Sequence, residues 1–277
     1  MQPGYWRLNK IAVPIDDATA NKRQLDINVT FTDLKEGKAE VDYAFSARGT
    51  SRSELQDLVM DFYDYKAEEQ KRFPFIGIEA LKPKQQQEAA KLVQEYLKSK
   101  PAKSYERLRK SLEEDFAITV DSLHPPVITQ TGRFDEAPDF KFSLKSKISG
   151  LTRPAGQNYL FEIGKLIEKQ FVASESKSIR NFDAYLAPPH QVSYTITVKL
   201  PEGYTVRGIE GLSAAADNEI GSVVMNARQK DNALVVTFVK TYKENFADKA
   251  AWAQLDSFLE TAKLLNGKQV LLESVGR

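Results

Sequence analysis

The stretch HQVSYTITVKLPEGYTV, which spans residues 190–206, is the most regular pattern in the chain and indicates how the chain folds. Apolar and polar side chains alternate along it, which is typical of a β-strand with one buried face. The segment Pro201-Glu202-Gly203 predicts a tight turn, because proline cannot donate a hydrogen bond within a sheet and glycine permits the reversed φ angle of a turn. The predicted buried set is Val192, Tyr194, Ile196, Val198 and Leu200.

The length of 277 residues fits one large or two ordinary domains, because single cores stop growing near about 250 residues, and we expect two. Its 39 Lys and Arg against 38 Asp and Glu leave a net charge of +1. We therefore expect no nucleic-acid partner and no anionic membrane surface held by bulk charge. No apolar run approaches the roughly 18 residues of a membrane span, so none is expected.

Two β-hairpins are predicted on either side of a possible domain boundary. Alternating patterns over residues 25–31 and 39–47 form the first, and residues 222–227 and 233–242 form the second. In the strand at 233–242, the even-numbered and the odd-numbered residues are both mostly apolar, which predicts a central strand covered on both faces. Further strands are expected at 118–120, at 140–148 with a basic outer face, and at 270–272.

Helical periodicity begins after residue 50. Ser51 and Glu54 predict a capping box at the start of one helix that runs to about Lys71. Separate helices are expected from about Pro83 and from about Ser104. The helix from Pro83 is expected to turn Ala89, Val93, Tyr96 and Leu97 inward, and a last helix should run from about Asp248 to Asn266-Gly267.

The glycine- and proline-containing segment 150–156 is the best boundary candidate. The pattern therefore predicts a mainly β, α+β chain of two β-sandwich-like domains with helical cover. Residues 1–150 would form a hairpin-containing linker domain with a helical insertion. Residues 151–277 would form a C-terminal domain with one amphipathic helix. Within it, residues 158–182 are compatible with helix or strand.

The chain contains few of the residue types that catalysis and metal binding use. It has no cysteine, which excludes disulfides, thiolate metal sites and cysteine nucleophiles. Its two histidines, His124 and His190, adjoin Pro-Pro pairs and are expected at turns or strand edges. No glycine-rich phosphate loop is present. We predict no catalytic residue, no metal and no cofactor.

Aromatic side chains are the candidate binding residues. Phe73 and Phe75 lie in an apolar loop at 73–78 that resembles a protein contact patch, and Tyr185 and Tyr204 are tyrosines able to stack on sugars. Packing at a core or edge is the commoner fate of such residues. A glycan-binding or glycan-hydrolysing domain would need a cleft with an aromatic floor, and hydrolysis would need two acids about 5–9 Å apart.

The segment Arg180 to Tyr204, RNFDAYLAPPHQVSYTITVKLPEGY, resembles the β-rich C-terminal region, of unknown function, of bacterial transglutaminase-like envelope proteins. Asn218 to Ser222, the second hairpin and the helix at 252–265 continue the similarity in order. The first half is similar in layout to the linker domain before that region. The resemblance implies that the Cys-His-Asp core of such proteins lies outside this chain, and that the chain is periplasmic or part of the cell envelope.

The sequence and the resemblance together lead to a hypothesis of function. We expect a non-catalytic accessory or interaction module from the C-terminal part of a transglutaminase-like envelope protein. Its partner would be the upstream transglutaminase-like core or another envelope protein. The alternative is a glycan-binding or glycan-hydrolysing β-domain.

Overall fold

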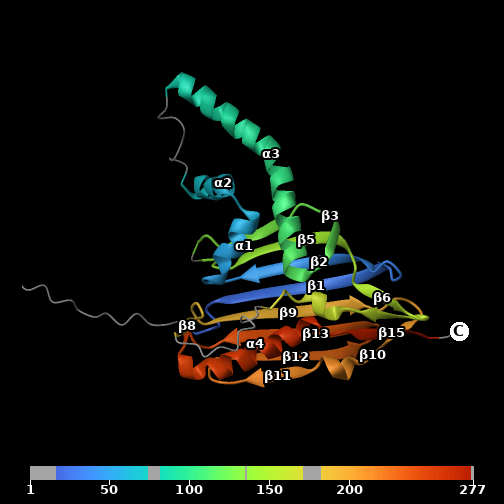
Figure 1. Ribbon diagram of the computed structural model, residues 1–277. Helices are drawn as coiled ribbons and strands as arrows, with labels where there is room; N and C mark the ends of the chain where they lie inside the picture. The colour runs from blue at the N-terminus through green and yellow to red at the C-terminus, as the bar shows by residue number, and fades with distance from the viewer. Residues whose placement is uncertain (1–16, 74–81, 135, 171–181, 276–277) are drawn as a thin grey trace, which may run out of the picture.

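A nine-stranded sheet forms the body of the protein (Figure 1). The computed structural model describes residues 17–73, 82–134, 136–170 and 182–275. Along the sheet the order is β11-β12-β13-β9-β1-β2-β5-β3, and β4 also pairs with β5. The strands are β11 (Ala214–Asp217), β12 (Gly221–Lys230), β13 (Ala233–Tyr242), β9 (His190–Lys199), β1 (Lys22–Asp33), β2 (Lys38–Ala47), β5 (Phe140–Ser149), β3 (Thr119–Leu123) and β4 (Val127–Thr131).

Strand β9 joins the two halves of this sheet. It pairs antiparallel with β13 and parallel with β1, so that Ile196 lies opposite both Val236 and Ile27. The predicted alternation is confirmed, since Tyr194, Ile196, Val198 and Leu200 are buried and Val192 is half-buried. Both hairpins are confirmed as β1–β2 and β12–β13. Strand β13 is central as predicted, but only one of its faces is fully buried.

The two faces of the sheet differ in character. One face carries the apolar core and is covered by helices, while on β1, β2 and β5 mostly polar and charged side chains line the other face. On that face Lys145 pairs with Asp42 at 3.2 Å and Lys147 pairs with Glu40 at 3.0 Å. This arrangement confirms the predicted basic outer face of β5, on which β2 balances Lys145 and Lys147, while Lys141 pairs with Asp139.

A smaller layer packs beside the C-terminal half of the large sheet. Segment 158–182, left open by the sequence, forms strand β7 and then the 3-10 turn η2 as far as the structure describes it. Helix α4 lies across β11 and β12 (Figure 1). The smaller sheet has the strand order β10 (Tyr204–Arg207), β15 (Val270–Ser274), β7 (Asn158–Phe161) and β6 (Thr152–Ala155). A separate pair is formed by β8 (Ala184–Tyr185) and β14 (Phe246–Ala247). The helical elements are η2 (Ile163–Leu166), η3 (Ile209–Leu212), η4 (Lys249–Ala251) and α4 (Trp252–Asn266).

The expected single helix after residue 50 is two helices, α1 (Ser51–Val59) and α2 (Phe62–Arg72). The capping box predicted at Ser51 is wrong, because the first turn of α1 has no side-chain cap. The box forms instead at Asp61, whose carboxylate accepts from the N–H groups of Tyr63 and Asp64. A carboxylate at this position stabilises a new helix start, so the chain breaks there.

The two helices expected from Pro83 and Ser104 are one, α3 (Pro83–Phe116), which continues through Pro101. Only its last turns are buried, through Leu108, Leu112 and Phe116. The first half rises away from the sheet (Figure 1). Pro101 removes one helical hydrogen bond, but it lies where the helix is exposed, so water can donate a hydrogen bond to the carbonyl that is left without its helical partner. The side chains expected inward are half-exposed at Ala89, Val93 and Tyr96 and exposed at Leu97.

The mainly β, α+β class is therefore confirmed, whereas two separate sandwiches are not. The large sheet runs through both halves of the chain, and the buried side chains form one connected cluster. The division into residues 1–150 and 151–277 stays a prediction. Within the described residues, no helix combines the length and the apolar composition of a membrane span.

Candidate functional site

The structure does not gather the predicted aromatic residues into one site. Phe73 ends α2 with 52% of its surface exposed, and Phe75 lies outside the described residues. Tyr185 is 65% exposed on β8, and its ring lies 5.2 Å from that of Phe246. Tyr204 is half-buried on β10 beside Tyr159, with ring centres 6.0 Å apart. Tyr185 and Phe246 thus form an exposed aromatic pair, while Tyr204 belongs to the smaller sheet.

The two histidines are at turns or strand ends, as expected. The His190 ring stacks on Tyr242 at 4.5 Å, and its Nδ1 lies 2.8 Å from the Pro188 carbonyl oxygen. His124 follows β3 and is exposed. In the described part of the chain, no cluster of three His, Asp or Glu side chains has the arrangement of a metal site.

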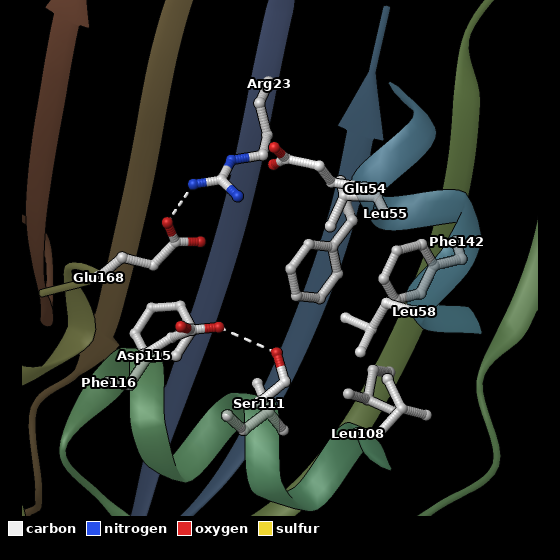
Figure 2. A pocket seen from close by; sticks show the side chains of 13 residues that line it. Arg23, Glu54, Leu55, Leu58, Leu108, Ser111, Asp115, Phe116, Phe142 and Glu168 are labelled. Carbon is white, nitrogen blue, oxygen red and sulfur yellow. Dashed lines mark hydrogen bonds and ion pairs between the residues drawn. The ribbon is translucent and has the colours of Figure 1, made fainter. Parts of the chain in front are cut away.

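A pocket of about 240 Å³ lies between the large sheet, α1 and the end of α3 (Figure 2). We call it the Arg23 pocket. Its floor is apolar and is contributed by β2, β5 and the two helices. These apolar side chains are Phe45, Leu55, Leu58, Leu108, Leu112, Phe116, Phe142 and Leu144.

Charged side chains line the upper part of the Arg23 pocket. The Arg23 guanidinium, from β1, lies between Glu54 and Glu168 and forms an ion pair with Glu168 (Figure 2). On α3, the Ser111 hydroxyl donates to the Asp115 carboxylate at 2.9 Å. Three acids and one arginine, drawn from four separate segments, therefore line the polar part of the pocket.

Asn266, at the end of α4, fixes the segment that carries Glu168. Its amide donates to the carbonyls of Ile167 at 2.9 Å and Glu168 at 3.1 Å, and its oxygen accepts from the Gln170 N–H at 2.9 Å. The next backbone N–H, of Lys169, donates to the Asp115 carbonyl at 2.7 Å. These bonds hold the segment against the end of α3.

The electrostatics of the Arg23 pocket are unbalanced toward negative charge. Burial raises the pKa of Glu168, with the neighbouring Asp115 adding to the effect and Arg23 opposing it. Burial also disfavours the Arg23 charge, but Glu168, Tyr194, Glu54 and Asp115 together outweigh it, so the pKa of Arg23 is raised. Burial, and then Glu168, raise the pKa of Tyr194 well above its usual value. The Tyr194 hydroxyl has no partner of hydrogen-bond geometry among the described residues.

Strand parity could have revealed two charged residues that sequence analysis did not single out. Arg23 shares its parity with Leu25 and Ile27, so the alternation of β1 places it on the core face. Lys240 shares its parity with the buried Phe238 in the same way, and it is 5% exposed. Glu168 carries no such signal, because it lies in an irregular segment.

A second hollow, of about 500 Å³, runs between α3 and the connection from β3 to β4. We call it the α3 groove. Two charged side chains, Asp64 and Lys100, lie at its edge and pair at 2.5 Å. His124 also lines it. Most of its wall is apolar and comprises Val59, Leu97, Pro101, Tyr105, Leu108, Leu123, Pro125, Pro126 and Ile128.

Residues 160–272 match the model of a family described as a domain of unknown function with a solved structure, DUF3858. The match begins in β7 and ends in β15, and so covers β9, the second hairpin and α4. No curated protein and no solved structure matches the chain. The C-terminal half thus contains a domain of unknown function, while the link to transglutaminase-like envelope proteins stays a prediction.

Proposed function

We propose that this chain is a non-catalytic interaction module that binds another protein through the α3 groove. In the whole protein it would be the C-terminal accessory part of a transglutaminase-like envelope protein, located in the periplasm or cell envelope. Its partner would be the transglutaminase-like core or a second envelope protein. The observation that carries the proposal is the wide apolar groove along a helix whose first half rises away from the sheet (Figure 1).

The α3 groove has the features of a protein-binding surface. Its lining is mostly apolar, and Leu97 on its wall is 48% exposed. Nearby, Leu92 is 66% and Phe62 is 71% exposed. Exposed apolar surfaces bordered by polar residues are typical of places where another protein binds. An apolar helix or extended segment of the partner would fill the groove, with its polar groups at the Asp64–Lys100 edge.

The base of the projecting helix is fixed, which favours a rigid contact surface. The Tyr96 hydroxyl donates to Asp61 at 2.6 Å, and Lys100 pairs with Asp61 at 3.2 Å. The rings of Tyr63 and Tyr96 lie 4.8 Å apart. A helix held in this way loses little conformational freedom when a partner binds.

Photo-crosslinking in native cells tests the proposal. A benzoylphenylalanine at position 97 lies in the groove, and one at Leu264, which is 67% exposed on α4, provides a matched control. We expect position 97, but not position 264, to form an adduct whose peptides belong to a transglutaminase-like core or an envelope protein. Equal adducts from both positions, or adducts only to copies of this chain, would contradict the proposal.

Glycan binding is the second candidate, because Tyr185 and Phe246 present neighbouring exposed rings. Such rings can stack on a sugar. On this alternative, Tyr185→Ala and Phe246→Ala should abolish retention on insoluble cell-wall polysaccharide. The control Phe62→Ala removes a single exposed ring elsewhere and should leave retention unchanged. Equal retention of all three variants would remove the alternative.

A further inference from the structure

We propose that the Arg23 pocket is a binding site for a small cationic amphiphile, a protonated amine attached to an apolar ring or short chain. This site is separate in chemistry from the α3 groove, and the inference does not depend on the function proposed for that groove. It rests on the size of the pocket, its apolar floor and the excess of carboxylates above that floor.

The size and the floor of the pocket fit a single ring. Apolar cavities of about 150 Å³ are known to bind benzene. The Arg23 pocket has about 240 Å³, which leaves room for a ring and a short chain. Phe45 and Phe142 stack within the floor, with ring centres 4.4 Å apart, and both side chains are buried. The floor is therefore preformed, and a ring entering it would displace water from apolar surface.

The charges of the lining select a cation. Glu54, Asp115 and Glu168 supply three carboxylates against the single guanidinium of Arg23. With all four ionised the formal charge is −2, and with Glu168 protonated it is −1. An ammonium group would lower this charge, whereas a carboxylate ligand would increase it. Because Arg23 is already paired with Glu168, it offers little to an anion.

Glu54 and Asp115 are the carboxylates free to receive the ammonium. Both residues are exposed, and they come from α1 and α3. Asp115 accepts the Ser111 hydroxyl, which leaves acceptor capacity on its other oxygen. Among the described ion pairs, neither Glu54 nor Asp115 has a cationic partner within 4.0 Å in this pocket. In the described part of the chain, these acids do not form a cluster that could hold a metal ion.

Calorimetric titration of the 277-residue chain with three probes tests the inference. The probes are 2-phenylethylamine, the anionic 3-phenylpropionate and the neutral 2-phenylethanol, which share a ring and a short chain. We expect the amine to bind at least about tenfold more tightly than the alcohol, since a charge-assisted hydrogen bond contributes about that factor. The acid should not bind. Equal affinity for the amine and the alcohol, or tighter binding of the acid, would overturn the inference.

Variants locate the site. Glu54→Gln and Asp115→Asn change exposed residues and should preserve folding, and each should weaken amine binding by about tenfold. Glu114→Gln, one residue from Asp115 on the same helix, removes a carboxylate that is 64% exposed outside the pocket. It should leave the affinity unchanged. If all three variants bind the amine as the unaltered protein does, the amine is bound elsewhere and the assignment is wrong.

Discussion

Replacing Lys240 with methionine should stabilise the protein. Lys240 lies on the core face of β13 with 5% of its surface exposed. Its ammonium donates to the Gln170 side chain at 2.9 Å and lies 4.9 Å and 5.3 Å from the ring centres of Tyr242 and Phe258. None of the ion pairs in the described part of the chain includes it. Burial lowers the pKa of Lys240 from 10.5 to about 8.

The magnitude follows from this pKa. Lowering a pKa from 10.5 to about 8 means that the charged form is disfavoured in the fold by about 3 kcal/mol. Methionine has a similar length and no charge, so Lys240→Met should raise the free energy of unfolding by about this amount near pH 7.5. Between pH 8 and 10.5 the unfolded chain binds more protons than the native protein, so the unaltered protein gains stability as the pH rises. The advantage of methionine should therefore fall to about 2 kcal/mol at pH 9.

Urea unfolding at pH 7.5 and pH 9.0 measures both values. Tyr242, whose ring lies beside the Lys240 ammonium, stays protonated over this range, because burial raises its pKa to about 12. Lys199→Met is the matched control, because Lys199 is exposed on the neighbouring strand β9. It should change stability by less than about 0.5 kcal/mol at either pH. A Lys240→Met variant that is destabilised, or whose gain is the same at both pH values, would refute the reasoning.

Three further changes test the packing around the candidate sites. Asn266→Ala removes three hydrogen bonds to the segment 167–170 and should lower the free energy of unfolding by about 2–3 kcal/mol, measured in urea. In Gly164→Ala, the added Cβ would lie 2.3 Å from the Asn266 carbonyl oxygen, so the free energy of unfolding should fall by about 1–3 kcal/mol in the same assay. The control Gly211→Ala should be nearly neutral, because its added Cβ would have no atom within 4 Å. Asp61→Ala removes the cap of α2 and should cost about 1 kcal/mol, with faster amide hydrogen exchange in α2. Burial raises the pKa of Asp61, but its hydrogen bonds from Tyr96, the backbone and Lys100 outweigh burial and lower the pKa below 3.8. The stabilisation of the fold by the Asp61 carboxylate should therefore be complete above pH 3.8 and be lost as the pH falls through the lowered pKa.

Local patterns predicted the strands well, because each depends on neighbours two residues apart. The alternation in β9 and β13 assigned their faces, and Pro201 to Gly203 gave the turn, where Gly203 has a φ of +79°. Strand alternation also indicates which charged residues lie on the core face of the sheet. Arg23 and Lys240 occupy core-face positions, and a charge at such a position requires a partner or a lowered pKa.

Long-range pairing was not accessible from the sequence. Arg23 and Glu168 are 145 residues apart, and no local pattern indicates that they meet. The capping box was also misplaced: it was predicted at Ser51, whereas Asp61, which precedes Asp64 by three residues, was not considered. Asp61 is the one that caps a helix, and there its carboxylate also receives the Tyr96 hydroxyl and lies beside Lys100. Tertiary contacts of this kind decide between local alternatives.

The pairing of β1 with β9 joins the two halves of the chain at the Arg23 pocket. These strands share a parallel ladder from Lys22–Gln191 to Thr30–Lys199, and the ion pair of Arg23 with Glu168 spans the same junction. A division of the chain near residue 150 would therefore separate two central strands and expose the backbone groups of both. Any relative motion of the halves would also break the wall of the Arg23 pocket. A ligand bound there contacts side chains from both halves, so its binding would stabilise their association by mass action.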